Sequence, residues 1–284
     1  LNVTRPDIIE GVHDAYFDVG VDCVETNTFG ANWSNLSDYD VDDRIEELAK
    51  AGAEIARESA EKYEKKDGRM RWTLGSMGPG TKLPSLGHTT YDHLKKTFAL
   101  QAKGLILGGA DAFMVETSQD LLQTKAAING CRVAMVETDT RLPLFVEVTV
   151  ETTGTMLMGS EINAALTALE PLGIDMIGLN CATGPQEMSE HLRQLSQHAE
   201  IPVMVMPNAG LPVLTATGAS YPLSPEDLAT AHEQFVKEFG LSLVGGCCGT
   251  TPEHLGAVVK RLGGTAPKLR TPSPEHGVAS LYQH

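Results

Sequence analysis

Short apolar stretches alternate with longer amphipathic stretches along most of the chain. The short stretches have the length of buried strands, and the longer ones repeat apolar residues at the three- to four-residue spacing of a helix. The predicted strands are 21–28, 72–77, 112–116, 144–150, 176–180, 202–206 and 241–244. The predicted helices between and after them are 43–63, 92–107, 121–136, 162–169, 186–199, 225–239 and 252–262.

The chain opens on a further predicted helix. Thr4, with Asp7 three residues later, has the spacing of a capping box. Gly20 is a helix-ending residue. Because they recur at helical spacing, four apolar residues are expected to form the buried face of this helix. They are Ile8, Val12, Tyr16 and Val19.

The strand–helix repeat of roughly 35 residues predicts an α/β fold with a parallel sheet. The seven strands are one short of a (β/α)8 TIM-type barrel, so we expect the first strand to precede Leu1. An open doubly wound sheet is the alternative. We favour the barrel because motif residues follow strands that are distant in sequence and must meet at one mouth. The expected domains are a barrel over 1–263 and a Pro-rich linker or tail over 264–284, cut from a longer chain.

Composition excludes several classes of function. The net charge of −15 argues against binding to a nucleic-acid backbone, which needs clustered Lys and Arg. No apolar run approaches the roughly 18 residues of a membrane span. Five cysteines among 284 residues do not make a disulfide framework. We therefore expect a cytoplasmic protein.

Two adjacent cysteines, Cys247 and Cys248, follow the last predicted strand and are flanked by Gly245, Gly246 and Gly249. Successive side chains on a strand point to opposite faces, so both sulfurs meet one ligand only if the backbone turns between them. Glycine permits such a turn because it has no Cβ penalty at positive φ. The alternative is a pair of buried small residues joined by a strained vicinal disulfide.

A third cysteine, Cys181, ends a strand two strand–helix units earlier. Strand ends of a barrel face a common mouth, so Cys181, Cys247 and Cys248 could converge on one Zn²⁺ with an open fourth position. Cys23 and Cys131 lie inside a strand and a helix and are expected to be core residues.

The charge of such a site predicts its chemistry. Zn²⁺ with three thiolates has a net charge of about −1 and is a poor Lewis acid toward a carbonyl. A substrate thiol can still bind the open position and lose its proton. The resulting thiolate is electron-rich enough to attack an alkyl donor, which predicts S-alkylation.

Three motifs resemble those of the zinc-dependent homocysteine S-methyltransferase family: Gly-Gly-Cys-Cys-Gly-Thr-Thr-Pro at 245–252, Gly-Leu-Asn-Cys-Ala-Thr-Gly-Pro at 178–185 and Glu-Thr-Asn-Thr-Phe at 25–29. Two more motifs, at 207–212 and 74–79, are most similar to the amino-terminal, homocysteine-binding modules of cobalamin-dependent methionine synthases. The resemblance extends from about Asn2 to Gly263.

The resemblance implies a (β/α)8 barrel with Cys181, Cys247 and Cys248 as zinc ligands and the homocysteine thiolate as the fourth ligand. Methylcobalamin on another module would give the methyl group, with 5-methyltetrahydrofolate as ultimate donor and methionine as product. The Asp-x-His-x-x-Gly signature of a cobalamin module is absent, so that cofactor would lie elsewhere. The implied partners are folate- and cobalamin-binding modules of the same longer polypeptide.

The resemblance also implies that Glu116 holds the amino group of the substrate. Glu25, Asn27 and Asn208 are further candidates for substrate binding at strand ends. Each has a structural alternative: a carboxylate satisfied by backbone N–H or a basic neighbour, and an amide that satisfies loop backbone.

Two other functions remain open. One is a stand-alone homocysteine S-methyltransferase that takes its methyl group from a free sulfonium or betaine-like donor. The other is an inactive barrel fragment that is stable only beside further modules.

Overall fold

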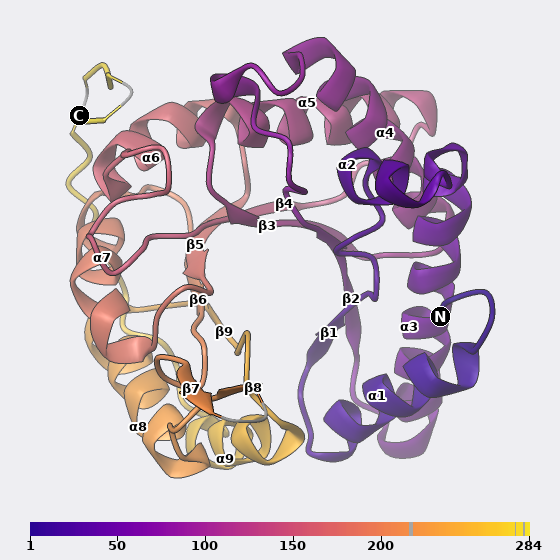
Figure 1. Cartoon of the computed structure of the whole chain (residues 1–284). Coiled ribbons are helices and arrows are strands. Elements are labelled where there is room, and N and C mark those ends of the chain that lie inside the picture. The colour runs from indigo at the N-terminus through magenta and orange to yellow at the C-terminus, as the bar shows by residue number, and fades with distance from the viewer. Residues whose placement is uncertain (216–217, 276, 281) are drawn as a thin grey trace. The chain divides into compact units, whose positions relative to one another are not determined.

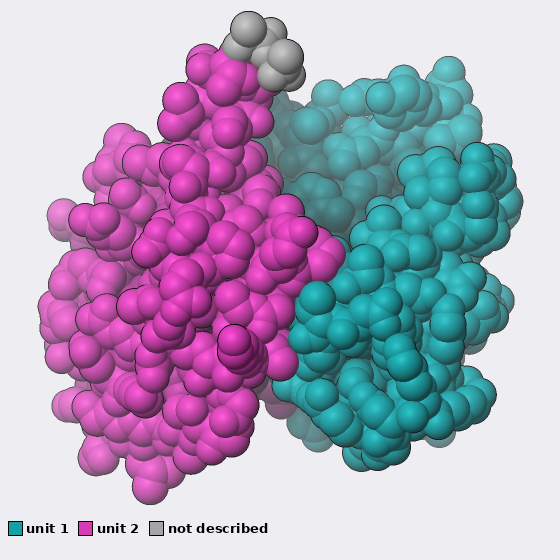
Figure 2. Space-filling view, turned by 90° about the horizontal axis from the view of Figure 1, so that it is seen from below, with its two compact units in different colours: residues 1–145 teal, residues 146–284 magenta. Residues whose placement is uncertain are grey.

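The computed structural model of the chain describes residues 1–215, 218–275, 277–280 and 282–284. The chain divides into two compact units, Leu1–Phe145 and Val146–His284 (Figure 2). Helices and strands alternate along both units (Figure 1). Seven strands within the described residues form one sheet in the order β1-β2-β3-β4-β5-β6-β9, and the pairings inside each unit are parallel. The predicted strand–helix repeat is confirmed.

The first unit contains three strands and the start of a fourth. β2 lies between β1 and β3, with Val24 opposite Thr73 and Gly75 opposite Phe113. Its elements are α1 (Pro6–Asp18), β1 (Cys23–Glu25), α2 (Trp33–Leu36), η1 (Ser37–Tyr39), η2 (Asp42–Arg44), α3 (Ile45–Asp67), β2 (Trp72–Met77), η3 (Pro84–Leu86), α4 (Tyr91–Leu107), β3 (Ala112–Ser118), α5 (Leu121–Glu137) and β4 (Leu144–Val148), which crosses the unit boundary.

Small residues let the helices of the first unit pack closely. A Cβ at Gly104 of α4 would lie 2.4 Å from the backbone oxygen of Glu46, and one at Gly108 would lie 2.5 Å from that of Lys50. Gly130 of α5 approaches α4 in the same way, because a Cβ there would lie 2.9 Å from the Lys95 oxygen. These glycines are therefore required by helix packing rather than by backbone conformation.

The prediction of the buried face of α1 is wrong, because the buried residues lie one position later in the sequence than predicted. Ile9, His13 and Phe17 are buried, whereas Ile8 and Val12 are 41% and 49% exposed. The Phe17 ring packs on Tyr63 of α3, with ring centroids 5.4 Å apart. Burial of this large aromatic ring sets the rotation of α1, since it removes more apolar surface from water than Val12 would.

The predicted N-cap of that helix is also wrong. Helix α1 begins at Pro6, and the residue before it, Arg5, makes no side-chain capping bond. Proline suits the first helical position because its missing N–H would have no partner there.

The second unit continues the parallel sheet and adds a hairpin. β6 lies between β5 and β9, with Gly178 opposite Met204 and Val205 opposite Val244. The remaining elements are α6 (Ile162–Leu169), η4 (Glu170–Leu172), β5 (Met176–Asn180), α7 (Pro185–His198), β6 (Val203–Met206), β7 (Val213–Thr215), β8 (Gly218–Ser220), α8 (Pro225–Gln234), the π-helix η5 (Phe235–Phe239), β9 (Leu243–Val244) and α9 (Pro252–Leu262).

Two features of the second unit were not expected from the sequence. The predicted helix 225–239 is an α-helix that ends in one π-helical segment, η5. The antiparallel pair β7–β8 was missed because all its described residues are exposed, so it carries no apolar periodicity. No helix among the described residues is long and apolar enough to cross a membrane.

The Pro-rich end of the chain, 264–284, has neither helix nor strand in the part that the structure describes. It nevertheless hydrogen-bonds to the second unit. Lys268 N donates to Val236 O at 3.1 Å, and Ser273 N donates to Gln197 O at 2.8 Å. The division into a barrel and a tail at residue 263 stays a prediction.

Candidate metal centre

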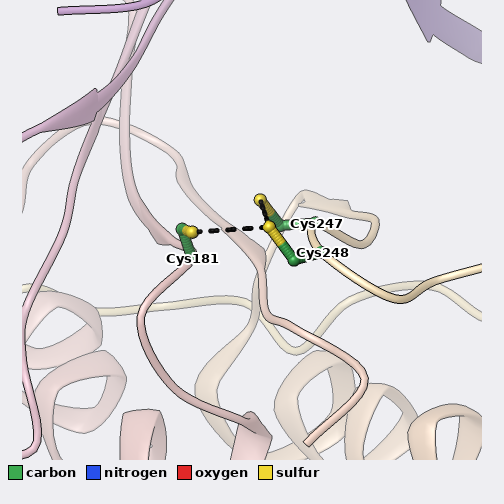
Figure 3. A group of neighbouring side chains, drawn as sticks. All are labelled: Cys181, Cys247 and Cys248. Carbon is green, nitrogen blue, oxygen red and sulfur yellow. Dashed lines mark hydrogen bonds between the residues drawn. The ribbon is translucent and has the colours of Figure 1, made fainter. Parts of the chain in front are cut away.

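The three predicted cysteines meet in the second unit (Figure 3). The Sγ atoms of Cys181 and Cys248 are 3.8 Å apart, and those of Cys247 and Cys248 are 3.9 Å apart. All three sulfurs lie within 4.8 Å of one another, and no other set of three His, Cys, Asp or Glu side chains in the described residues does so. Tetrahedral Zn²⁺ with bonds of about 2.3 Å holds its sulfur ligands about 3.8 Å apart, so this spacing fits the ion.

Left-handed backbone aims the Cys181 sulfur at the other two. Cys181 and Ala182 follow β5 with φ of 61° and 55°, and neither residue is glycine. Thr183 N closes the turn by donating to Cys181 O at 2.6 Å. Two consecutive residues in this sparsely populated region cost free energy, and such strain clusters at functional sites.

The loop after β6 joins the two cysteine segments. Cys181 N donates to Met206 O at 3.2 Å, and Cys247 N donates to Pro207 O at 2.8 Å. Because β6 pairs with both β5 and β9, its end lies between the two strands that carry the cysteines. Backbone bonds to one short segment therefore set the spacing of the sulfurs.

Asn208, a predicted substrate-binding residue, completes this connection. It is buried, and its Oδ1 accepts from Cys248 N at 3.1 Å. The backbone N–H of Asn208 donates to Thr183 O at 3.1 Å, and the backbone N–H of Ala209 donates to Cys248 O at 2.9 Å. Asn208 thus positions Cys248; contact with a substrate stays a prediction.

Only one of the three flanking glycines is required for its backbone conformation. Gly249 has φ of 79°, whereas Gly245 and Gly246 are outside the left-handed region. Gly246 is required for space, since a Cβ there would lie 2.3 Å from the Thr250 side chain. The prediction that glycine permits the turn through positive φ is therefore confirmed at Gly249. At Gly246 glycine is required because a larger residue would collide with Thr250.

Two buried histidines missed by sequence reasoning hold the loops around the sulfurs. His232 Nε2 donates to Gly245 O at 2.7 Å, and burial lowers the pKa of His232 to about 4. His254 Nε2 donates to Leu223 O at 2.9 Å, while its Nδ1 accepts from Thr251 N at 3.2 Å. The only signal in the sequence was that His232 and His254 lie on the apolar sides of the helices α8 and α9. A histidine in such a position is more often a core residue than a functional one.

The thiols stabilise one thiolate among themselves. Hydrogen bonds from Cys181, and then from Cys247, lower the pKa of Cys248 to about 2. The pKa of Cys247 is raised because its proton is held by Cys181 and Cys248. Cys248 is the exposed member, and the other two are half-buried. A divalent cation would replace the remaining thiol protons, because metal ligands must be deprotonated.

The other two cysteines lie outside this cluster. Cys131 is buried in α5, and Cys23 lies in β1 of the first unit. Burial raises the pKa of both thiols, to about 12 for Cys23. Both are therefore poor metal ligands. The predicted core role is confirmed for Cys131, whereas Cys23 is half-buried in the structure.

Glu25 and Glu116 approach each other in the first unit, on β1 and β3 with β2 between them. Glu116 is buried, and Ser76 Oγ on β2 donates to its Oε1 at 2.5 Å. Burial, and then the charge of Glu116, raise the pKa of Glu25. Glu25 Oε1 is buried without a hydrogen bond within the described part of the chain. The role of the two carboxylates toward a substrate stays a prediction.

Asn27 has a structural partner. Its side chain is exposed, and Nδ2 donates to Asn2 Oδ1 at 2.7 Å. Asn2 Nδ2 in turn donates to Asn27 O at 2.9 Å. This reciprocal pair supports the loop-stabilising alternative for Asn27, and no contact tests the substrate-binding one.

Comparison with known proteins shows relatives along nearly the whole chain. The family model described as homocysteine S-methyltransferase matches residues 1–262. Methionine synthase of Mycobacterium tuberculosis (strain ATCC 25618 / H37Rv) is 61% identical over 282 residues, which are 99% of this chain and 24% of that protein. Methionine synthase of Mycobacterium leprae (strain TN) is 60% identical over 287 residues, with the same coverage. The chain spans about a quarter of the length of both relatives.

Solved structures give the same fold. The metallated form of the homocysteine methyltransferase MmuM from Escherichia coli matches with a TM-score of 0.75 at 20% identity, covering 92% of this chain and 86% of that one. Its oxidized form matches with a TM-score of 0.71. This likeness confirms the predicted α/β fold of the TIM-barrel type, with seven strands in place of the eight of a complete barrel. With the family model matched over residues 1–262, the chain belongs to the homocysteine S-methyltransferase family.

Proposed function

We propose that this chain is the homocysteine-binding module of a methionine synthase, in which the thiol of homocysteine is activated and methylated. The observation that carries the proposal is the cluster of three sulfurs at the spacing of zinc ligands, with Cys248 exposed. Membership of the family supports it, as do relatives of 60–61% identity that are named methionine synthase.

Cys181, Cys247 and Cys248 would hold the Zn²⁺. The ion, when bound, lowers the pKa of a thiol that occupies its fourth position. The chain's own contribution is to present three thiolates in fixed directions, through the left-handed turn at Cys181 and the amide of Asn208. With the ion bound, the three cysteines would be thiolates, so the S–H proton to be lost would be that of the incoming thiol.

Glu116 and Glu25 would bind the amino group of homocysteine. Burial and the charge of Glu116 raise the pKa of Glu25. A positively charged group beside the two carboxylates would therefore be favourable. An ammonium group placed between the carboxylates would relieve their repulsion and supply hydrogen bonds to both. Ser76 would keep Glu116 in the required rotamer.

The methyl donor in this proposal is methylcobalamin on another module, with 5-methyltetrahydrofolate as ultimate donor. The lengths of the relatives support the presence of such modules, because both relatives are about four times as long as this chain. Methionine biosynthesis in the cytoplasm is part of the proposal, and five free cysteines suit a reducing compartment.

The test is metal content together with methyl transfer. Protein purified anaerobically with zinc is expected to hold one Zn²⁺ per chain, and Cys181→Ala, Cys247→Ala and Cys248→Ala each to lose most of it. Cys131→Ala, at a buried cysteine outside the cluster, is the matched control and should keep its zinc. Wild-type protein without stoichiometric metal would contradict the proposal.

Methionine formation is then measured from homocysteine with added methylcobalamin, or with a free sulfonium or betaine in its place. The proposal expects activity with methylcobalamin. Comparable turnover with a free sulfonium alone would indicate a stand-alone methyltransferase instead. Zinc binding without turnover on any donor would indicate a fragment that needs its further modules.

A further inference from the structure

The peptide group that joins Cys247 to Cys248 is held at both of its polar atoms. Its N–H, on Cys248, donates to Asn208 Oδ1 at 3.1 Å. Its oxygen, on Cys247, accepts from Thr250 N at 3.2 Å and from Thr250 Oγ1 at 2.6 Å. Because a peptide group is planar, bonds at both of these atoms fix the orientation of the whole plane. That orientation is set by ψ of Cys247 and φ of Cys248, the angles that also decide how the two side chains point relative to each other.

The bond from Thr250 N to Cys247 O closes a four-residue turn that begins at the first of the two adjacent cysteines. Gly249, the third residue of this turn, has φ of 79°, as the third residue of a type II turn does. The turn replaces the strand geometry that would point successive side chains to opposite faces. It leaves the Sγ atoms of Cys247 and Cys248 3.9 Å apart.

The side chain of Thr250 is itself held against the turn. A Cβ at Gly246 would lie 2.3 Å from Thr250 Cγ2 and 2.7 Å from its Oγ1, so the threonine packs on the glycine backbone. The next residue, Thr251, is the N-cap of α9, and its N–H donates to His254 Nδ1 at 3.2 Å. His254 Nε2 in turn donates to Leu223 O at 2.9 Å. Thr250 therefore joins the cysteine turn to a helix end that is anchored independently.

We propose that Thr250 is a positioning residue of the metal centre, whose hydroxyl, together with Asn208, clamps the peptide group between Cys247 and Cys248. The inference rests on the proposed zinc function. Without the hydroxyl the Cys247 carbonyl keeps the bond from Thr250 N, but the peptide plane has more freedom to rotate. Ordering the two sulfurs around the ion then costs more conformational entropy, and zinc binds more weakly.

The test is the dissociation constant for Zn²⁺, measured by competition with a chelator under anaerobic, reducing conditions. Thr250→Ser and Thr250→Ala both lack the methyl group and differ from each other by the hydroxyl alone. We expect Thr250→Ala to bind zinc about threefold to tenfold more weakly than Thr250→Ser, the range of one hydrogen bond. Thr250→Ser should bind nearly as tightly as wild type.

Two further variants serve as controls. Thr138 Oγ1 donates to Ala134 O at 2.8 Å in the first unit, so Thr138→Ala removes the same kind of bond far along the chain from the cysteines. It should keep the zinc affinity of wild type. Thr250→Val also lacks the hydroxyl but retains bulk beside Gly246. It should bind zinc as weakly as Thr250→Ala, and it serves in place of that variant if Thr250→Ala does not fold.

A double-variant comparison tests whether Thr250 and Asn208 act on one peptide group. Loss of either side chain already frees the plane, so the second loss should add little. The affinity loss in Asn208→Ala combined with Thr250→Ala is therefore expected to be smaller than the product of the two single losses. Two side chains that stabilise the fold independently would give the full product.

The outcomes separate this inference from the proposed function. Wild-type protein that binds no zinc contradicts the proposed function. Wild-type protein that binds zinc, with equal affinities in Thr250→Ser and Thr250→Ala, overturns the role of the Thr250 hydroxyl alone. Single losses that multiply in the double variant overturn the shared clamp.

Discussion

At the residue scale, Gly249 shows how closely one position can be constrained. Its φ of 79° disfavours any side chain, and a Cβ would lie 2.3 Å from the Tyr221 ring. Gly249→Ala is expected to destabilise the protein by about 2–4 kcal/mol, through backbone strain and displacement of the ring. Urea unfolding followed by circular dichroism measures the change.

A matched control exists in the same unit. Gly154 has φ of 87°, yet nothing lies within 4 Å of an added Cβ. Gly154→Ala should cost only the backbone penalty of about 1 kcal/mol. Equal losses in the two variants would show that the contact with Tyr221 carries no free energy.

His232 predicts a dependence of stability on pH. Burial lowers its folded pKa to about 4, against about 6.5 in the unfolded chain. The unfolded state therefore binds the proton first as pH falls, so stability is full above pH ~6.5 and declines toward pH ~4, by about 3 kcal/mol in total. His13, whose pKa burial also lowers to about 4, contributes in the same direction.

The measurement is urea unfolding at pH 8 and pH 5. His232→Gln cannot titrate, and its amide can still donate to Gly245 O, so this variant should lose distinctly less stability between the two pH values than wild type does. His13→Gln, in the first unit, tests the contribution of His13 in the same way, and it should also reduce the pH dependence. An unchanged pH dependence in His232→Gln would mean that His232 is protonated equally in both states.

At the element scale, the close approach of α3 and α4 depends on glycine. A Cβ at Gly104 would lie 2.4 Å from Glu46 O and 2.9 Å from Ala49 Cβ. Gly104→Ala should therefore destabilise the protein by about 1–3 kcal/mol through overpacking, although alanine is the better helix former. Thermal unfolding monitored by circular dichroism tests this.

Gly11→Ala on α1 should have the opposite sign. Nothing lies within 4 Å of a Cβ at Gly11, and the residue is exposed. We expect a gain of about 0.5–1 kcal/mol, since alanine loses less backbone entropy on forming the helix. Stabilisation by both variants would contradict the packing argument at Gly104.

Several elements could be predicted from periodicity and several could not. β2, β5, α6 and α9 were predicted with the bounds that the structure shows, because each combines an apolar run with clear start or stop residues. The buried side of α1 was missed, since Ile8 and Ile9 begin two overlapping apolar stripes. Contact between Phe17 and Tyr63, which are far apart in sequence, selects one of them.

At the scale of the whole molecule, zinc should stabilise the fold by mass action. Binding to the folded state alone adds about 2.7 kcal/mol when free zinc is a hundredfold above its dissociation constant. Wild-type protein is therefore expected to show a midpoint of thermal unfolding that falls when a chelator removes the metal. Calorimetry with and without chelator measures the difference.

The control for zinc linkage is Cys247→Ala, whose midpoint should not respond to the chelator. Cys131→Ala should respond as wild type does, because Cys131 is outside the cluster. A chelator effect of the same size in Cys247→Ala would place the stabilising metal elsewhere on the chain.

The amino-acid sequence by itself determined the alternation of strands and helices, the family motifs and the identity of the three cysteines, because these depend on local periodicity and residue type. Only the tertiary structure decided that the sulfurs lie 3.8–3.9 Å apart, that Tyr221 covers Gly249 and that His232 holds Gly245. Apart from the adjacent pair Cys247 and Cys248, these contacts join residues that are separated in sequence. They form because backbone hydrogen bonds bring the ends of β5, β6 and β9 to a common edge, where short loops place the side chains.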